Sequence, residues 1–203
     1  MDELGHATIW YGLLADITGD NPDRLAFFRK AAEFRNVQFV ELPKGDWAFT
    51  IVRQFLFDVA EHVRLEALTG SKFEPLAAAA AKMRNEELYH FRHSHAWLQR
   101  LGLGTEESHR RMQNTLDEIW LYISQLFEPL PAEALLVEAS YVTEPSKLCT
   151  QWDTLVIPNL QQADLIVPEN ETAAPGRNEH TQYLEDLLRD MQVVARLDPQ
   201  AEW

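Results

Sequence analysis

The chain has 203 residues, 46% of them hydrophobic, which suffices for one domain with a sizeable core. Its 32 acidic residues outnumber 18 lysines and arginines, and this formal net charge of −14 argues against nucleic acid or an anionic membrane surface as the main partner. A single cysteine excludes a disulfide framework and fits a reducing cytoplasm, and no apolar run is long enough to span a membrane.

The N-terminal quarter shows helical periodicity. A helix is expected over 2–18, with Gly19 as its stop. Residues at spacings of three and four form one stripe along it: Glu3, His6, Trp10, Leu13 and Ile17. The Asn-Pro-Asp sequence at 21–23 predicts a second helix to about residue 35, because proline suits a first helical turn. The stretch 37–42 is too short to assign. The chain starts directly in its first helix, so we expect that a preceding helix is missing.

Three longer helices are predicted next. Asp46 is the expected N-cap of a helix that ends near residue 69, and Glu74-Pro75 opens another that ends near residue 101. Only a few residues join these two helices, so they must form an antiparallel hairpin. Thr105 is expected to cap a third helix over about 106–127, which the sequence "EPLPAE" then breaks.

The rest of the chain is also expected to be helical, with one long loop. Helices are predicted over 131–141 and 145–164, and Pro158 should kink or end the second. The polar stretch 166–180 should be a surface loop, followed by an amphipathic helix over 181–197. The pattern predicts an all-α bundle forming one domain over 1–203, with the bundle over about 1–128 and C-terminal helices and loop over about 129–203.

Two Glu-x-x-His motifs are the best clue to function. Glu3 and His6 lie in "DELGHA", and Glu87 and His90 lie in "NEELYH". Residues three apart share a face of a helix, so each carboxylate and imidazole can bind the same ion. Two such pairs on two helices of one bundle are the usual pattern of a carboxylate-bridged dimetal site.

The predicted hairpin supplies a fifth candidate ligand. Counting from its loop, Glu87 and His90 lie level with positions 53–56 of the preceding helix, and Asp58 falls within the error of two to four residues. Asp58 stands among apolar neighbours in "QFLFDVA", where an unpartnered carboxylate would be costly. The other interpretation stays open: either motif can instead be an ion pair on a charged helix surface.

Several stretches carry a resemblance to a known family. "DELGHA", "NEELYH" and "FLFD" resemble the ferritin-like subunits of bacterial ring-1,2-phenylacetyl-CoA epoxidase, a multicomponent monooxygenase of aerobic phenylacetate catabolism. The stretches at 25–58, 90–105 and 176–203 are similar to the C-subunit branch of that family in particular. The resemblance covers nearly the whole chain and implies a ferritin-like bundle that apparently lacks its first helix, with a helical C-terminal extension.

The resemblance implies a partner, a metal and a division of labour. Members of the C-subunit branch pair with a catalytic di-iron A subunit and other epoxidase subunits, are described as structural, and have lost most metal ligands. By position, this chain instead matches the ligand motifs of the A subunit, with Glu3, His6, Asp58, Glu87 and His90. Iron is the expected metal and manganese the second choice. Three alternatives stay open: a metal-free scaffold, a stand-alone di-iron oxidase or ferroxidase, and a homodimer that completes the bundle.

Overall fold

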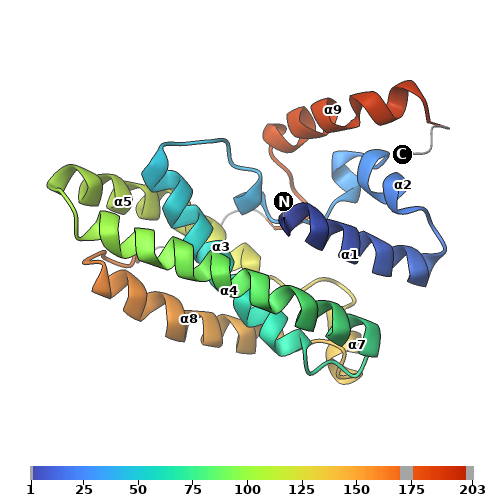
Figure 1. Ribbon diagram of the computed structural model, residues 1–203, viewed down its shortest axis with the longest axis horizontal. Coiled ribbons are helices and arrows are strands. Elements are labelled where there is room, and N and C mark those ends of the chain that lie inside the picture. The colour runs from blue at the N-terminus through green and yellow to red at the C-terminus, as the bar shows by residue number, and fades with distance from the viewer. Residues whose placement is uncertain (1, 170–175, 200–203) are drawn as a thin grey trace. The chain divides into compact units, whose positions relative to one another are not determined.

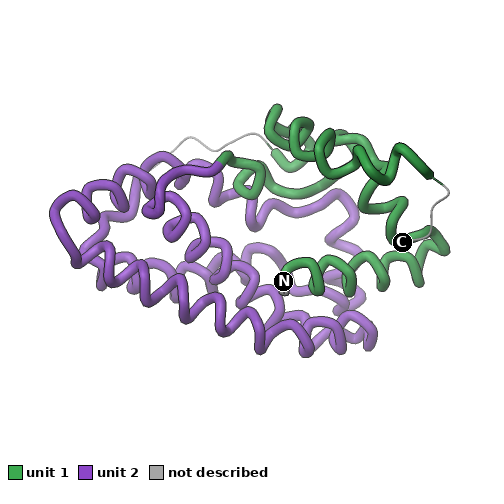
Figure 2. The backbone as a smooth tube through the Cα atoms, turned by 45° about the horizontal axis from the view of Figure 1, so that its top comes forward, with its two compact units in different colours: residues 1–43, 175–203 green, residues 44–174 purple. Residues whose placement is uncertain are grey.

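Helices are the only regular elements in residues 2–169 and 176–199, the part of the chain that this computed structural model describes (Figure 1). The predicted all-α class is confirmed. None of the described helices is long and apolar enough to cross a membrane. The chain divides into two compact units: unit 1 comprises residues 1–43 and 175–203, and unit 2 comprises residues 44–174 (Figure 2). The single domain expected over 1–203 stays a prediction.

Unit 1 joins the two ends of the sequence. The helix α2 packs against both α1 and α9, and α9 also contacts the short 3-10 helix η1. The elements of this unit are α1 (Asp2–Thr18), α2 (Pro22–Phe27), η1 (Ala31–Glu33), η2 (Gln38–Val40) and α9 (Gln182–Leu197). The first and last helices occupy the predicted ranges. Gly19 adopts φ 73° just after α1, which is a conformation that glycine enters without steric cost.

The second predicted helix is wrong in length, because α2 ends at Phe27 rather than near residue 35. Arg29 explains the early end. Its guanidinium lies 4.1 Å from the centre of the Phe34 ring and donates a hydrogen bond to the Tyr11 hydroxyl at 2.9 Å. These tertiary contacts replace further helical turns, and helix propensity alone cannot reveal them.

A buried polar cluster around Glu41 fastens the C-terminal part of unit 1 to its N-terminal part. One carboxylate oxygen, Oε2, accepts hydrogen bonds from the backbone N–H and the hydroxyl of Thr181 at 2.7 and 2.8 Å. The other, Oε1, lies 2.7 Å from Nδ1 of His180 and accepts a hydrogen bond from the amide of Asn36 at 2.8 Å. The side chain of Glu41 is only 1% exposed. We call these four residues the Glu41 cluster.

Unit 2 is built around the helix α3. This helix packs against α4, α5 and α8, and its residues Val52, Phe55 and Leu56 are fully buried. The predicted antiparallel hairpin of α3 and α4 is confirmed. The elements of unit 2 are α3 (Trp47–Leu68), α4 (Glu74–Gly102), α5 (Glu106–Ile119), η3 (Trp120–Tyr122), α6 (Ile123–Leu126), α7 (Glu133–Glu138) and α8 (Pro145–Gln162).

Local capping sets the starts of two helices in unit 2. Asp46 and Thr105 cap α3 and α5 as predicted, by accepting hydrogen bonds from the backbone N–H groups of Phe49 and Ser108 at 2.9 and 3.1 Å. The helix predicted over 106–127 is wrong in one respect, because η3 interrupts it. There the Trp120 ring packs 5.9 Å from the ring of a buried tryptophan, Trp152.

Two further predictions for unit 2 concern α7 and α8. The helix α7 is shorter than expected, because Ser140 adopts φ 61° and the chain turns away. In contrast, α8 does not end at Pro158, which was one of the two outcomes expected there, and a kink at this residue stays a prediction. Pro158 and Thr154, whose carbonyl loses its helical partner, are both exposed, so water can replace the missing hydrogen bond.

Candidate metal centre

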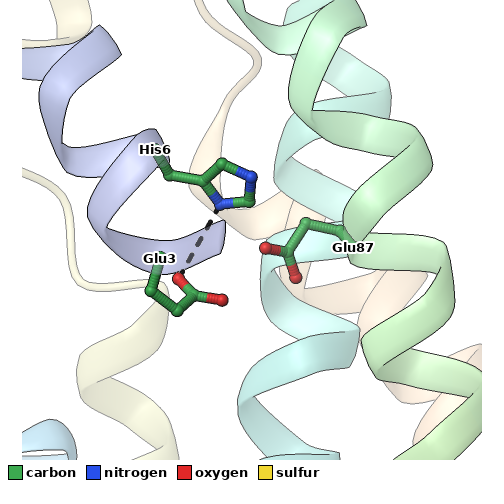
Figure 3. A group of neighbouring side chains, drawn as sticks. All are labelled: Glu3, His6 and Glu87. Atoms are coloured by element: carbon green, nitrogen blue, oxygen red, sulfur yellow. Dashed lines mark ion pairs between the residues drawn. The ribbon is translucent and has the colours of Figure 1, made fainter. Parts of the chain in front are cut away.

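The first Glu-x-x-His motif lies in the opening turns of α1. In Figure 3 the side chains of Glu3 and His6 project from neighbouring turns on the same side of this helix. Nδ1 of His6 lies 3.7 Å from a carboxylate oxygen of Glu3. The spacing of three residues therefore brings a carboxylate and an imidazole together, as predicted.

The second motif lies in the middle of α4, within unit 2. Nδ1 of His90 lies 3.8 Å from a carboxylate oxygen of Glu87. The side chain of Glu87 is 5% exposed and that of His90 is 19% exposed. Figure 3 shows the Glu87 carboxylate projecting sideways from its helix. The same donor types thus recur, in a position largely closed to solvent.

Asp58 is buried on α3, as its apolar neighbours suggested. The residue is 1% exposed, and one of its carboxylate oxygens accepts a hydrogen bond from Nε2 of Gln54 at 2.6 Å. Among the described residues of unit 2, the ligand atoms of Asp58, Glu87 and His90 do not all three lie within 4.8 Å of one another. Their joint role as ligands remains a prediction.

His62 lies near Asp58 but is not among the five predicted ligands. It follows Asp58 by four residues, so both lie on one face of α3. Its Nδ1 atom is buried and has no hydrogen-bond partner among the described residues, and its ring stacks on Phe91 at 5.9 Å. The spacing of four from Asp58 was the available signal. An imidazole nitrogen left without a partner is available to a ligand or a bound water.

Another carboxylate on α3 already has a cationic partner. Glu61 forms an ion pair with Arg64 on the same helix. The remaining donors are carboxylate oxygens and imidazole nitrogens, a mixed set that suits iron or manganese. The chemistry of the donors in each unit therefore fits the predicted metals.

The fold is all-α, with a carboxylate–imidazole pair on each of α1 and α4 and a buried aspartate on α3. These features are typical of helical bundles that use glutamate, aspartate and histidine as metal ligands. A comparison with protein families narrows this class. The family model described as Phenylacetic acid catabolic protein matches residues 1–203, and the chain belongs to this family.

One relative gives a more specific match. The chain is 35% identical over 207 aligned positions to the C subunit of 1,2-phenylacetyl-CoA epoxidase from Escherichia coli (strain K12). The alignment covers 100% of this chain and 83% of the relative. The resemblance predicted from the sequence is confirmed, both for the family and for its C-subunit branch.

Proposed function

We propose that this chain is a ferritin-like subunit of a phenylacetyl-CoA ring epoxidase in aerobic phenylacetate catabolism. The observation that carries this proposal is the match to the C subunit of the E. coli epoxidase, which extends along the whole chain. In this function the chain pairs with a homologous catalytic A subunit inside the multicomponent complex. The sequence has no flavin or nicotinamide motif, so a separate reductase supplies the electrons. A cytoplasmic location stays a prediction.

We further propose that the chain retains metal ligands. The support is the pairing of a carboxylate with an imidazole on each of two helices, together with the buried carboxylate on α3. Iron would supply activation of O2 when bound, and manganese is the alternative. In this assignment the two glutamates are bridging or terminal carboxylates, the histidines are terminal ligands, and the aspartate is a terminal carboxylate: Glu3, Glu87, His6, His90 and Asp58.

Metal analysis of the protein expressed with iron tests the second proposal. We expect about one equivalent of iron or more in the unaltered protein, and less than about a tenth of an equivalent in Asp58→Ala or His90→Ala. His95→Ala is the matched control, because His95 lies on another face of the same helix and should leave the iron content unchanged. An iron content below about a tenth of an equivalent in the unaltered protein would contradict metal binding.

The metal-free scaffold is the second candidate. It is favoured by the distances of 3.7 and 3.8 Å within the two pairs, because a carboxylate and an imidazole that lie so close can contact each other without a metal between them. Co-expression with a homologous A subunit separates the interpretations. A scaffold still co-purifies after His90→Ala, and a stand-alone oxidase or ferroxidase is active without the partner. Failure to co-purify would contradict the proposed complex, whatever the metal content.

A further inference from the structure

The segment just before α9 is tied to the first part of unit 1 by polar contacts. His180 and Thr181 both belong to the Glu41 cluster, in which they contact the carboxylate of Glu41. One residue earlier, the backbone carbonyl of Glu179 accepts a hydrogen bond from the side-chain amide of Gln38 at 2.9 Å. We call residues 179–181 with these contacts the latch, because they join α9 to residues 34–41.

The carboxylate of Glu41 is surrounded by hydrogen-bond donors. The backbone N–H of Thr181 and the side-chain amide of Asn36 can only donate, so the ionised carboxylate is the form that suits them. A charged carboxylate whose side chain is 1% exposed needs a positive partner, because burial of an uncompensated charge is costly. Among the residues that the structure describes, His180 is the one ion-pair partner of Glu41.

The imidazole of His180 faces an oxygen at each of its ring nitrogens. Nδ1 lies 2.7 Å from Oε1 of Glu41, and Nε2 lies 3.2 Å from the carbonyl oxygen of Phe34. A neutral imidazole carries one N–H, so beside an ionised carboxylate one of its nitrogens would turn a lone pair toward an oxygen. The imidazolium carries hydrogen on both nitrogens and satisfies both contacts. The side chain of His180 is only 7% exposed, so water has little access to replace a lost contact.

We propose that the Glu41–His180 pair is a proton-dependent latch for α9, closed while the pair holds a proton. In the closed latch the imidazolium offers an N–H to each of its two oxygen neighbours. When the pH rises, the proton passes from the ring to water, and one ring nitrogen then presents a lone pair to an oxygen. The closed latch thus holds the proton more firmly than the released segment does. Its stabilisation is present at lower pH and is lost as the pH rises through the titration of the closed pair.

Other charges near the ring act in both directions. Besides Glu41, charged groups occur on the segments around η1, in and beside the latch, and in the first turn of α9: Arg29, Glu33, Arg35, Arg177, Glu179 and Glu185. The guanidinium of Arg35 donates to the carbonyl of Phe34 at 2.6 Å, so it opposes a second positive charge there. The N-terminus of α9 acts in the same sense. The carboxylate of Glu41 favours the imidazolium, and it prevails because it touches the ring.

Opening of the latch would change the apolar surface of unit 1. Within this unit α9 packs against α2 and η1, and it buries Leu184, Leu188 and Ala195. The same helix already exposes Leu187 and Val194, at 59% and 54%. Release of α9 would add its buried side chains to the exposed ones, and a larger exposed apolar patch promotes association. The latch therefore links pH to the apolar surface that α9 presents.

The protonation of His180 can be measured in the unaltered protein. Nitrogen NMR of ¹⁵N-labelled histidine distinguishes a ring nitrogen that carries hydrogen from a bare one, and the signals are assigned through the backbone of His180. At pH 7.5 an ordinary histidine is about nine-tenths neutral, whereas we expect both ring nitrogens of His180 to carry hydrogen. His109 is the internal control. The one hydrogen bond of its ring among the described residues joins Nδ1 to the carbonyl oxygen of Gly102 at 2.8 Å, so it should show a bare Nε2.

Hydrogen exchange of α9 measures whether the latch opens. With rates corrected for the intrinsic effect of pH, we expect the protection of α9 to fall at least about tenfold between pH 6.5 and pH 9. In His180→Gln, whose amide can still donate to Glu41 but does not titrate, protection should change less than about twofold over the same range. The helices α3 and α4 should keep their protection in both proteins, because no residue of the latch lies in unit 2.

Three outcomes would overturn the proposal. Constant protection of α9 from pH 6.5 to pH 9 in the unaltered protein would mean that the proton does not hold the segment. An equal alkaline loss in His180→Gln would assign the effect to other titrating groups. A bare ring nitrogen on His180 at pH 7.5 would overturn the latch even where His180→Gln does not fold, since that measurement needs only the unaltered protein.

Discussion

Asp46 combines a helix cap with an ion pair in one carboxylate. It accepts a hydrogen bond from the backbone N–H of Phe49 at 2.9 Å, and it lies 2.9 Å from Nη1 of Arg111. The hydrogen bond from Phe49 is the main cause, and Arg111 the second, of a pKa lowered below the usual value of 3.8. A lowered pKa in the folded state means that this carboxylate stabilises the fold above its unfolded pKa. The contribution is lost as the pH falls through the folded pKa.

We therefore predict a pH-dependent cost for Asp46→Ala. At pH 7 the free energy of unfolding should fall by about 1 kcal/mol, the usual value of an N-cap. The loss should shrink as the pH drops below about 4. Urea unfolding at both pH values measures this. Asp46→Asn is the control, because asparagine caps helices about as well without a titrating charge. An equal loss at pH 7 and pH 3 would contradict the assignment.

Features of the candidate site could be predicted from the sequence only where they depend on residues close to one another along the chain. The pairs Glu3–His6 and Glu87–His90 could be predicted, because helical spacing alone brings their side chains together. The burial of Asp58 could be predicted from its apolar neighbours. The burial of His62 Nδ1, which has no hydrogen-bond partner in the described part of the chain, could not be predicted, because it depends on what α3 packs against.

At the scale of whole elements, the end of α4 packs closely against the end of α8. Gly102 is buried there beside Ala163, which follows α8. A Cβ atom added at Gly102 would lie 2.4 Å from the backbone carbonyl oxygen of Ala163 and 2.8 Å from its Cβ atom. A backbone oxygen cannot move aside as a side chain can, so glycine is required where these two helix ends meet.

Gly102→Ala should therefore separate the two helix ends. We expect the free energy of unfolding to fall by about 1–3 kcal/mol, as overpacked cores usually show. Gly12→Ala in α1 is the matched control, since its added Cβ meets nothing within 4 Å. That substitution should raise stability by about 0.5–1 kcal/mol, because glycine is unfavourable inside a helix. The midpoints of urea unfolding of both variants, compared with that of the unaltered protein, measure these changes in stability. No loss in Gly102→Ala would contradict the close approach.

Element boundaries follow the sequence wherever a cap or a stop is encoded locally. Asp46, Thr105 and Gly19 fix three helix ends at or next to the predicted positions. The predictions are wrong where a distant side chain decides, as Arg29 does after α2 and Trp152 does beside η3. Propensity is a weak preference that such tertiary contacts override.

At the scale of the whole molecule, the two ends of the chain belong to the same unit: residues 1–43 and 175–203 form unit 1. Residues Glu41 and His180, 139 positions apart, make the central contact of the Glu41 cluster. His180 also lies 3.2 Å from the carbonyl oxygen of Phe34 through its Nε2 atom, so both ring nitrogens face oxygen acceptors. Contacts at such separation leave no periodic trace in the sequence. The division into units could therefore not be predicted, although the resemblance along the chain already indicated the family.

The Glu41 cluster provides a test of whether the two units unfold separately. Glu41→Ala removes a buried carboxylate and leaves Asn36, His180 and Thr181 without their acceptor. Breaking such a cluster should cost α9 at least about 2 kcal/mol of protection against hydrogen exchange. The helices α3 and α4 should keep their protection, because every member of the cluster lies in unit 1.

Hydrogen exchange measured segment by segment distinguishes the outcomes. Glu185→Ala, which removes an exposed carboxylate from α9, is the control and should leave protection unchanged apart from fraying at the helix start. Unchanged protection in Glu41→Ala would mean that the cluster does not fasten the C-terminal segment. An equal loss in α9 and in α3 would mean that both units unfold together, and it would support the single domain predicted over 1–203. A loss confined to unit 1 would instead make the ends of the chain an independent folding unit.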